Sequence, residues 1–219
     1  MTEIKDNIEQ IQSKLPSRVA LVAVSKRKPI EDIKAAYDYG VLDFGENKVQ
    51  EFLTKVDELP KDIRWHFIGH LQSNKVRKII GKIALIHSLD RNSLAKEIQR
   101  ISKEEEVVTE CLIEINIGEE PQKSGILLKN LDNFIEKLKD YDHIKVKGLM
   151  AIIPQGTEEE NRIYFKKMHE LFLNLKEKES ERFSMDILSM GMSNDYKIAM
   201  EEGSNMVRVG TLIFGERTN

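Results

Sequence analysis

The chain has 219 residues, of which 40% are hydrophobic and 32% are charged, with a formal net charge of −3 at pH 7. This length allows one sizeable core, and the charge excludes bulk electrostatic attraction to nucleic acid. The lone Cys111 excludes an internal disulfide, no apolar run reaches membrane-spanning length, and the first residues lack the apolar stretch of a signal peptide. We therefore expect a cytoplasmic protein that binds neither nucleic acid nor membrane.

Hydrophobic periodicity predicts alternating helices and strands along the whole chain. A first helix over 2–15 carries Ile4, Ile8, Ile11 and Leu15 on one face. Eight buried strands are then predicted over 19–25, 42–45, 64–69, 84–89, 108–116, 144–152, 185–190 and 206–214. Helices are predicted between them over 29–39, 47–59, 74–80, 92–105, 128–139, 159–178 and 194–202.

A helix between each consecutive pair of strands is typical of a parallel sheet with right-handed crossovers. Eight such units predict a closed (β/α)8 TIM-type barrel with an extra N-terminal helix, as one domain over 1–219. A flavodoxin-like sheet needs only five or six strands, and a Rossmann fold needs Gly-x-Gly-x-x-Gly after the first strand. The sequence meets neither requirement.

The first strand ends in a lysine that continues its buried row of side chains. Period-two alternation places Val22, Val24 and Lys26 on one face. Active sites of these barrels lie where strands end and helices begin. A lysine at a strand end is most often a solvated surface group, but this register makes Lys26 a candidate for a Schiff base with an aldehyde cofactor.

The last strand presents an arginine opposite two valines. Val207 and Val209 share one face, so Arg208 points into the barrel if the valines meet the helices. A buried guanidinium there needs a ligand or an acidic partner. Both alternatives stay open, because alternation also turns Glu114 inward, where it would form a structural ion pair with Arg208.

The last two strand ends carry the pattern of a phosphate site. Such sites in these barrels use the loops after strands seven and eight. Gly191 allows close backbone approach, Ser193 offers a hydroxyl at a helix start, and Gly210 and Thr211 follow the last strand. For either loop alone, a capping serine or a space-relieving glycine is the simpler interpretation. Both loops together favour phosphate binding.

Three signals are weaker. Asn47 follows the second strand, as a helix cap or as a hydrogen-bond donor to a ring hydroxyl. His66 and His70 stand four apart, but their segment reads as a strand and no third ligand is evident, so we expect no metal. The eight methionines, Met190 among them, are expected to fill the core.

Seven segments together identify a family. The chain resembles the pyridoxal phosphate homeostasis proteins, whose barrel is similar to the N-terminal domain of alanine racemase. The matching segments are 23–26 (AVSK), 44–51 (FGENKVQE), 65–75 (WHFIGHLQSNK), 123–125 (KSG), 148–150 (GLM), 188–193 (LSMGMS) and 207–215 (VRVGTLIFG).

The resemblance implies a cofactor and its residues. Pyridoxal 5′-phosphate (PLP) would be held covalently on Lys26, with Asn47 near its ring and Arg208 facing its pyridine nitrogen. The phosphate would be bound by Ser193, Gly210 and Thr211, and Met190 is included among the cofactor-binding residues.

The resemblance leaves two functions to weigh. The first is a non-catalytic monomer that buffers PLP or delivers it to PLP-dependent apoenzymes. The second is a PLP-dependent amino-acid racemase of fold type III, which needs a lysine on one face of the substrate and usually a tyrosine on the other. In alanine racemase-like enzymes that tyrosine comes from a second domain. This sequence ends at Asn219 and places only Tyr196 near the site. We therefore expect a carrier and not an enzyme, and no catalytic residues. A sugar-phosphate enzyme on the same barrel would lack an acid–base pair beside Lys26.

Overall fold

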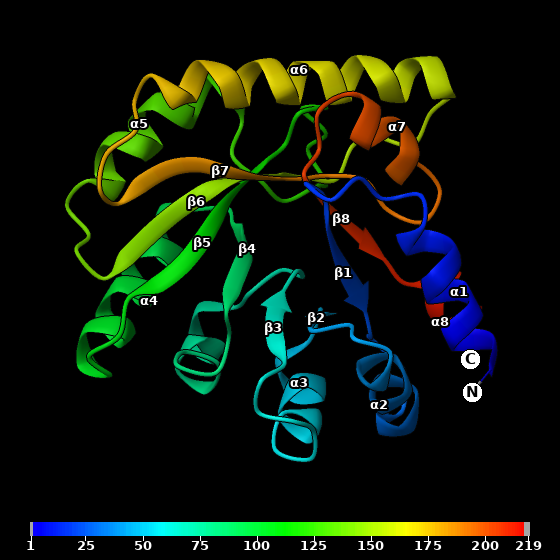
Figure 1. The fold of residues 1–219 in the computed structure, drawn as a ribbon. Helices are drawn as coiled ribbons and strands as arrows, with labels where there is room; N and C mark the ends of the chain where they lie inside the picture. The colour runs from blue at the N-terminus through cyan, green and yellow to red at the C-terminus, as the bar shows by residue number, and fades with distance from the viewer. Residues whose placement is uncertain (1, 217–219) are drawn as a thin grey trace.

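The strands close into a parallel barrel in which each strand pairs with its neighbours in the chain. In this computed structural model, which describes residues 2–216, β1 to β8 follow in order and β8 pairs back onto β1 (Figure 1). The predicted eight-stranded barrel is therefore confirmed. The strands are β1 (Ala20–Val24), β2 (Asp43–Glu46), β3 (Arg64–Phe67), β4 (Leu85–Leu89), β5 (Thr109–Ile115), β6 (Ile144–Ala151), β7 (Phe183–Ser189) and β8 (Met206–Val209).

Helices cover the outside of the barrel, and the extra N-terminal helix is also confirmed. It packs beside the second and the last helix, where Asn7 Nδ2 donates to the carbonyl of Ile213 at 3.1 Å (Figure 1). The helices are α1 (Thr2–Gln12), α2 (Ile30–Asp38), α3 (Val49–Lys55), the 3₁₀-helix η1 (Ser73–Lys78), α4 (Asn92–Glu104), α5 (Leu128–Leu138), α6 (Glu158–Lys176), α7 (Tyr196–Glu201) and α8 (Thr211–Phe214).

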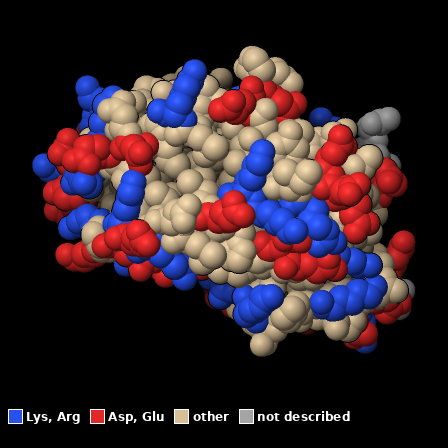
Figure 2. Space-filling model, turned by 90° about the horizontal axis from the view of Figure 1, so that it is seen from above, with Lys and Arg blue, Asp and Glu red and all other residues tan. Residues whose placement is uncertain are grey.

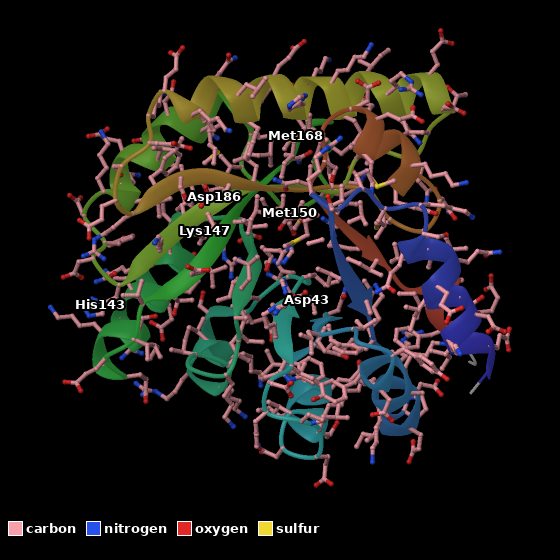
Figure 3. The ribbon with its side chains drawn as sticks, in the orientation of Figure 1. Asp43, His143, Lys147, Met150, Met168 and Asp186 are labelled. Atoms are coloured by element: carbon pink, nitrogen blue, oxygen red, sulfur yellow. The ribbon has the colours of Figure 1, made fainter. Side chains whose placement is uncertain are left out.

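Two hydrophobic cores follow from the alternation of side chains along each strand. The larger core lies between strands and helices and includes Val207 and Val209. The smaller core fills the barrel, with Met150 near the centre of the ring of strands (Figure 3). Its buried members are Val22, Leu85, Leu112, Met150 and Met206. The prediction that Arg208, between the two valines, points inward is therefore confirmed.

Two predicted elements differ from the structure. The strand predicted over 206–214 ends at Val209, and Thr211–Phe214 forms the short helix α8. Ile213 and Phe214 are buried there as helical residues, and a short apolar run does not distinguish a strand from a buried helix. The helix predicted over 74–80 is a single 3₁₀ segment, η1, a form common in short connections.

The surface shows no dominance of one charge on the face of Figure 2, where acidic and basic side chains are interspersed. Within residues 2–216, no helix has both the length and the apolar character needed to cross a membrane.

Candidate functional site

A cavity of about 700 Å³ opens at the carboxyl ends of the strands. Six of the seven predicted site residues line it: Lys26, Asn47, Ser193, Arg208, Gly210 and Thr211. They come from four strand ends, after β1, β2 and β7 and along β8. The seventh, Met190, does not line the cavity. Its side chain is fully buried in the outer core, while Met192, two residues further on, lines the cavity.

The turn that carries Lys26 rests on a buried polar cluster. Ser25 Oγ donates to Glu46 Oε1 at 2.6 Å, and Lys55 Nζ donates to the Ser25 carbonyl at 2.9 Å and to Glu46 Oε1 at 2.8 Å. Burial raises the pKa of Glu46, although the charge of Lys55 opposes the shift. Glu51 Oε1 accepts from Lys55 Nζ at 2.7 Å within α3 and also from the backbone N–H of Arg27, and this second bond ties α3 to the turn. The backbone of residues 25–26 is therefore fixed by hydrogen bonds from the side of α3.

A second lysine, Lys28, lines the same cavity but is engaged by the chain itself. Its Nζ donates to the carbonyl oxygens of Phe214 at 2.8 Å, Glu216 at 3.1 Å and Gly215 at 3.2 Å. These three bonds fix the Lys28 amine at the end of α8.

Asn47 has a side-chain amide oxygen that can accept a hydrogen bond from a ligand. Its Oδ1 is buried and has no partner among the described residues, and the side chain lines the cavity. The predicted alternative of a helix cap is wrong, because Lys48 is the N-cap residue of α3 and the cap has no side-chain bond. The backbone of Asn47 sits against Gly69, where a Cβ would lie 2.4 Å from the Asn47 carbonyl oxygen. Gly69 therefore permits this close approach.

The loops after β7 and β8 meet at one side of the cavity. The N–H of Gly210 donates to Ser193 Oγ at 3.3 Å, which joins the two loops directly. Neither the N–H of Ser193 nor that of Thr211 donates to an acceptor in the described part of the chain. Ser193 does not cap α7, whose N-cap residue is Asp195. Hydroxyls and unused N–H groups thus gather where a phosphate was predicted.

Arg208 is only 3% exposed and extends into the barrel interior. Its Nη1 donates to the Ser189 carbonyl at 2.9 Å and to Ser189 Oγ at 2.6 Å, and its Nη2 donates to the Ala151 carbonyl at 3.0 Å. Among residues 2–216, Arg208 makes no ion pair with Glu114, the partner that the sequence suggested. Burial lowers the pKa of Arg208 to about 10, which keeps it cationic at neutral pH.

Sequence reasoning missed one wall of the cavity and one buried polar residue inside the barrel. The wall is the segment from Ile152 to Gly156 with Asn161, between β6 and α6. Its residue types carry no chemical signature, so nothing in the sequence indicated it. The missed polar residue is His87, which does not line the cavity but is fully buried inside the barrel, on the same face of β4 as Leu85 of the inner core. The alternation Leu-Ile-His-Ser-Leu was a usable signal.

The two histidines weighed as metal ligands do not act together. His66 lies in β3 and bonds His87, whereas His70 follows the strand and bonds Asp90 at 3.1 Å. No cluster of three metal-ligating side chains occurs among residues 2–216.

Comparison with known proteins places this geometry in a wider context. A family model described as the N-terminal domain of alanine racemase matches residues 1–218. A pyridoxal phosphate homeostasis protein of Aquifex aeolicus is 45% identical over 199 residues, which are 90% of this chain and 86% of that protein. The structure of PipY of Synechococcus elongatus with PLP bound is 34% identical, with a TM-score of 0.89, and covers 97% of this chain and 100% of that one. Alanine racemase from Corynebacterium glutamicum, at 17% identity and a TM-score of 0.76, shares the fold over 98% of this chain and 60% of its own.

Proposed function

Because this chain belongs to the pyridoxal phosphate homeostasis protein family, we propose that it binds PLP in the cavity at the carboxyl end of the barrel. We further propose that Lys26 holds PLP as a Schiff base and that the protein buffers PLP in the cell, or delivers it to apoenzymes, without turnover. The observation that carries the proposal is the convergence of six predicted residues from four strand ends on one cavity.

The residues present fit the cofactor. PLP is a dianionic phosphate ester with an aldehyde, a ring hydroxyl and a ring nitrogen. The cavity offers the hydroxyls and N–H groups of Ser193 and Thr211 for the phosphate, and the buried Oδ1 of Asn47 seeks a donor such as a ring hydroxyl. A Cβ at Gly210 would lie 3.1 Å from the Val24 carbonyl, so glycine keeps this loop close to β1.

Lys26 is the lysine best placed to hold the aldehyde. It follows a buried strand, lines the cavity and rests on the Ser25–Glu46–Lys55 cluster, which fixes its backbone. Lys28, the other lysine of the cavity, is bonded to the end of α8. When bound, PLP supplies an aldehyde that condenses with a primary amine and a ring that withdraws electrons.

Arg208 would weaken that electron withdrawal. Three of its five N–H hydrogens are used by Ser189 and Ala151, which leaves two donors for a group in the cavity. A fixed cation beside the ring nitrogen disfavours protonation of that nitrogen, and an unprotonated ring is a weaker electron sink. This feature supports a binding role over a catalytic one.

The described residues also offer no evident second base. No tyrosine lines the cavity within residues 2–216. Tyr196 is only 4% exposed and packs in the outer core. Asp195 lines the cavity, but its Oδ1 accepts the N–H of Met192 at 2.6 Å. Two-sided proton transfer at a substrate carbon, which racemisation needs, is therefore not supported.

Borohydride reduction tests the Schiff base. The protein loaded with PLP should be yellow, and reduction followed by peptide mapping should place a pyridoxyl group on Lys26. Lys26→Ala should abolish the adduct. Lys28 lines the same cavity and so provides a matched control, and Lys28→Ala should retain the adduct on Lys26. Modification of Lys28 in the parent protein would overturn the assignment.

Deuterium exchange tests the absence of turnover. Loaded protein incubated with L-alanine in deuterated water should show little exchange of the α-proton. Exchange or racemisation at about 1 per second or faster would replace the binding proposal by the racemase alternative. A loaded Arg208→Glu variant should exchange faster than the parent, since a carboxylate favours the protonated ring.

A further inference from the structure

A continuous row of hydrogen-bonded side chains crosses the barrel interior from the cavity to the opposite end. Arg208 Nη1 lies 2.6 Å from Ser189 Oγ, which lies 3.1 Å from His87 Nδ1. His87 Nε2 lies 2.9 Å from His66 Nδ1, and His66 Nε2 lies 2.9 Å from Asp43 Oδ1. Asp43 is the first residue of β2, whereas the cavity lies at the carboxyl ends of the strands, so Asp43 lies at the opposite end of the barrel. Four strands besides β2 contribute to the row.

The cavity end of this row fixes the direction of its hydrogen bonds. A guanidinium only donates, so Ser189 Oγ accepts from Arg208. The Ser189 hydroxyl hydrogen is then available for His87 Nδ1, which accepts it in the arrangement that leaves no buried hydroxyl hydrogen without a partner. Burial, reinforced by the charge of Arg208, lowers the pKa of His87 well below 6.5, so this imidazole is neutral. Its one proton is therefore on Nε2 and points to His66.

The opposite end of the row gives the same direction. Asp43 is held by Arg64 through Nε at 2.7 Å and Nη2 at 2.5 Å. Burial alone would raise the pKa of Asp43, but the hydrogen bonds of Arg64 and His66 outweigh it and hold that pKa at about 2. An ionised carboxylate only accepts, so His66 donates from Nε2. His66 Nδ1 then accepts from His87.

Only this arrangement satisfies every member of the row with neutral imidazoles. Had both ring nitrogens of His66 carried protons, His87 would have to donate from Nδ1 to Ser189. The Ser189 hydroxyl would then accept from two neighbours, and its own hydrogen would have no partner in the row. Ser189 and His87 are fully buried, so a stranded hydrogen there carries a desolvation cost.

We propose that His87 and His66, both as Nε2–H tautomers, are positioning residues that orient the Arg208 guanidinium through a one-way chain ending on Asp43. Both Nη1 hydrogens bond Ser189 and one Nη2 hydrogen bonds the Ala151 carbonyl, which leaves two donors of a guanidinium that lines the cavity. Its effect on PLP rests on the proposed function, whereas the tautomers are a property of the protein alone.

Nitrogen NMR of the imidazoles tests the chain without PLP. The sequence has five histidines, so a His70→Gln/His143→Gln/His169→Gln variant labelled with ¹⁵N-histidine keeps only the two of interest. Both remaining rings should show a protonated Nε2 and a non-protonated Nδ1 at neutral pH. An Nδ1–H tautomer or a cationic ring at either position would overturn the proposed chain.

Two substitutions at His87 separate its two bonds. His87→Asn places an amide oxygen near the Nδ1 position and keeps an acceptor for Ser189, whereas His87→Leu removes both bonds. His87→Leu should weaken PLP binding about fivefold, the change expected from one lost buried hydrogen bond. It should also shift the pH titration of the PLP absorbance band. His87→Asn should restore most of the affinity and the parent titration.

A control on the same strand isolates positioning from general loosening of the barrel. Leu85→Val changes the inner core two residues before His87 and should leave the absorbance titration unchanged. The positioning role fails if His87→Leu binds PLP like the parent, or if Leu85→Val shifts the titration equally. Correct tautomers in a parent protein that does not bind PLP would refute the proposed function and leave the chain intact.

Discussion

Glu114 is a buried carboxyl group whose replacement should change the pH dependence of stability. It lies in β5 and is only 7% exposed. Burial, reinforced by the charge of Asp90, raises its pKa to about 7 against the opposing charges of Arg208 and Arg91. The folded protein therefore keeps a proton that the unfolded chain releases above its ordinary pKa of 4.5. The contribution of Glu114 to the free energy of unfolding is therefore largest below pH 4.5, and it falls as the pH rises to about 7.

The raised pKa sets the size of this effect. The free energy of unfolding should fall by about 1.4 kcal/mol per pH unit across that window, or about 3 kcal/mol in all. Glu114→Gln removes the titration, so above pH 7 the variant should be more stable than the parent by up to about 3 kcal/mol, and near pH 4.5 the two should agree. His87 acts in the opposite sense, because its lowered pKa makes stability fall as the pH drops.

Urea unfolding of the PLP-free protein over a pH series measures the difference between parent and variant. Taking that difference cancels the contribution of His87 and of every other group common to both proteins. The matched control Glu110→Gln, on the same strand but partly exposed, should leave the parent profile unchanged. A constant difference across the window would show that Glu114 titrates like a solvated carboxyl, and the reasoning from burial would then be refuted.

Two further predictions concern the phosphate loops and the cluster beneath Lys26. Ser193→Ala/Thr211→Ala should weaken PLP retention, because each charge-assisted bond to phosphate contributes about 1.5–3 kcal/mol. Equal retention through dialysis, or equal affinity of the parent for unphosphorylated pyridoxal, would contradict it. Lys55→Met should lower the free energy of unfolding by about 3–5 kcal/mol, because it leaves the buried Glu46 unpaired. The control Lys61→Met, at an exposed pair, should have no measurable effect, and an equally small effect at Lys55 would rule out a stabilising cluster.

The order of the strands was predictable because short strand-like runs alternate with helical patterns along the chain. Alternation within a strand was equally informative, since it correctly turned Arg208 away from Val207 and Val209. It could not say where β8 ends, because the apolar run continues beyond Gly210 into a helix that buries Ile213 and Phe214. A short apolar run predicts that its residues are buried. Whether its backbone is a strand or a helix depends on the tertiary contacts.

The sequence could not predict which inward-facing side chains contact one another, and the reason is geometric. His87 and Ser189 stand 102 residues apart and meet because closure brings β4 and β7 within reach across the interior. Which inward residues meet depends on the tilt and stagger of the strands, and alternation fixes neither. The sequence therefore placed Arg208 inside the barrel but suggested Glu114 as its partner, where the structure has Ser189 and Ala151.

The layering of the barrel explains how a binding site can be rigid and yet poor in proton-transfer groups. Leu85, Leu112 and Met206 form part of the apolar inner core, and a polar residue follows each of them two positions later. These residues are His87, Glu114 and Arg208. This polar layer lies between those apolar residues and the cavity, which Arg208 lines. Arg208 there bonds Ser189, which bonds His87 in turn, so the fixed dipoles of these two side chains hold a cation in one orientation. In the proposed complex, a PLP ring whose nitrogen faces this fixed cation would be oriented without being protonated, which is what the proposed retention without turnover requires.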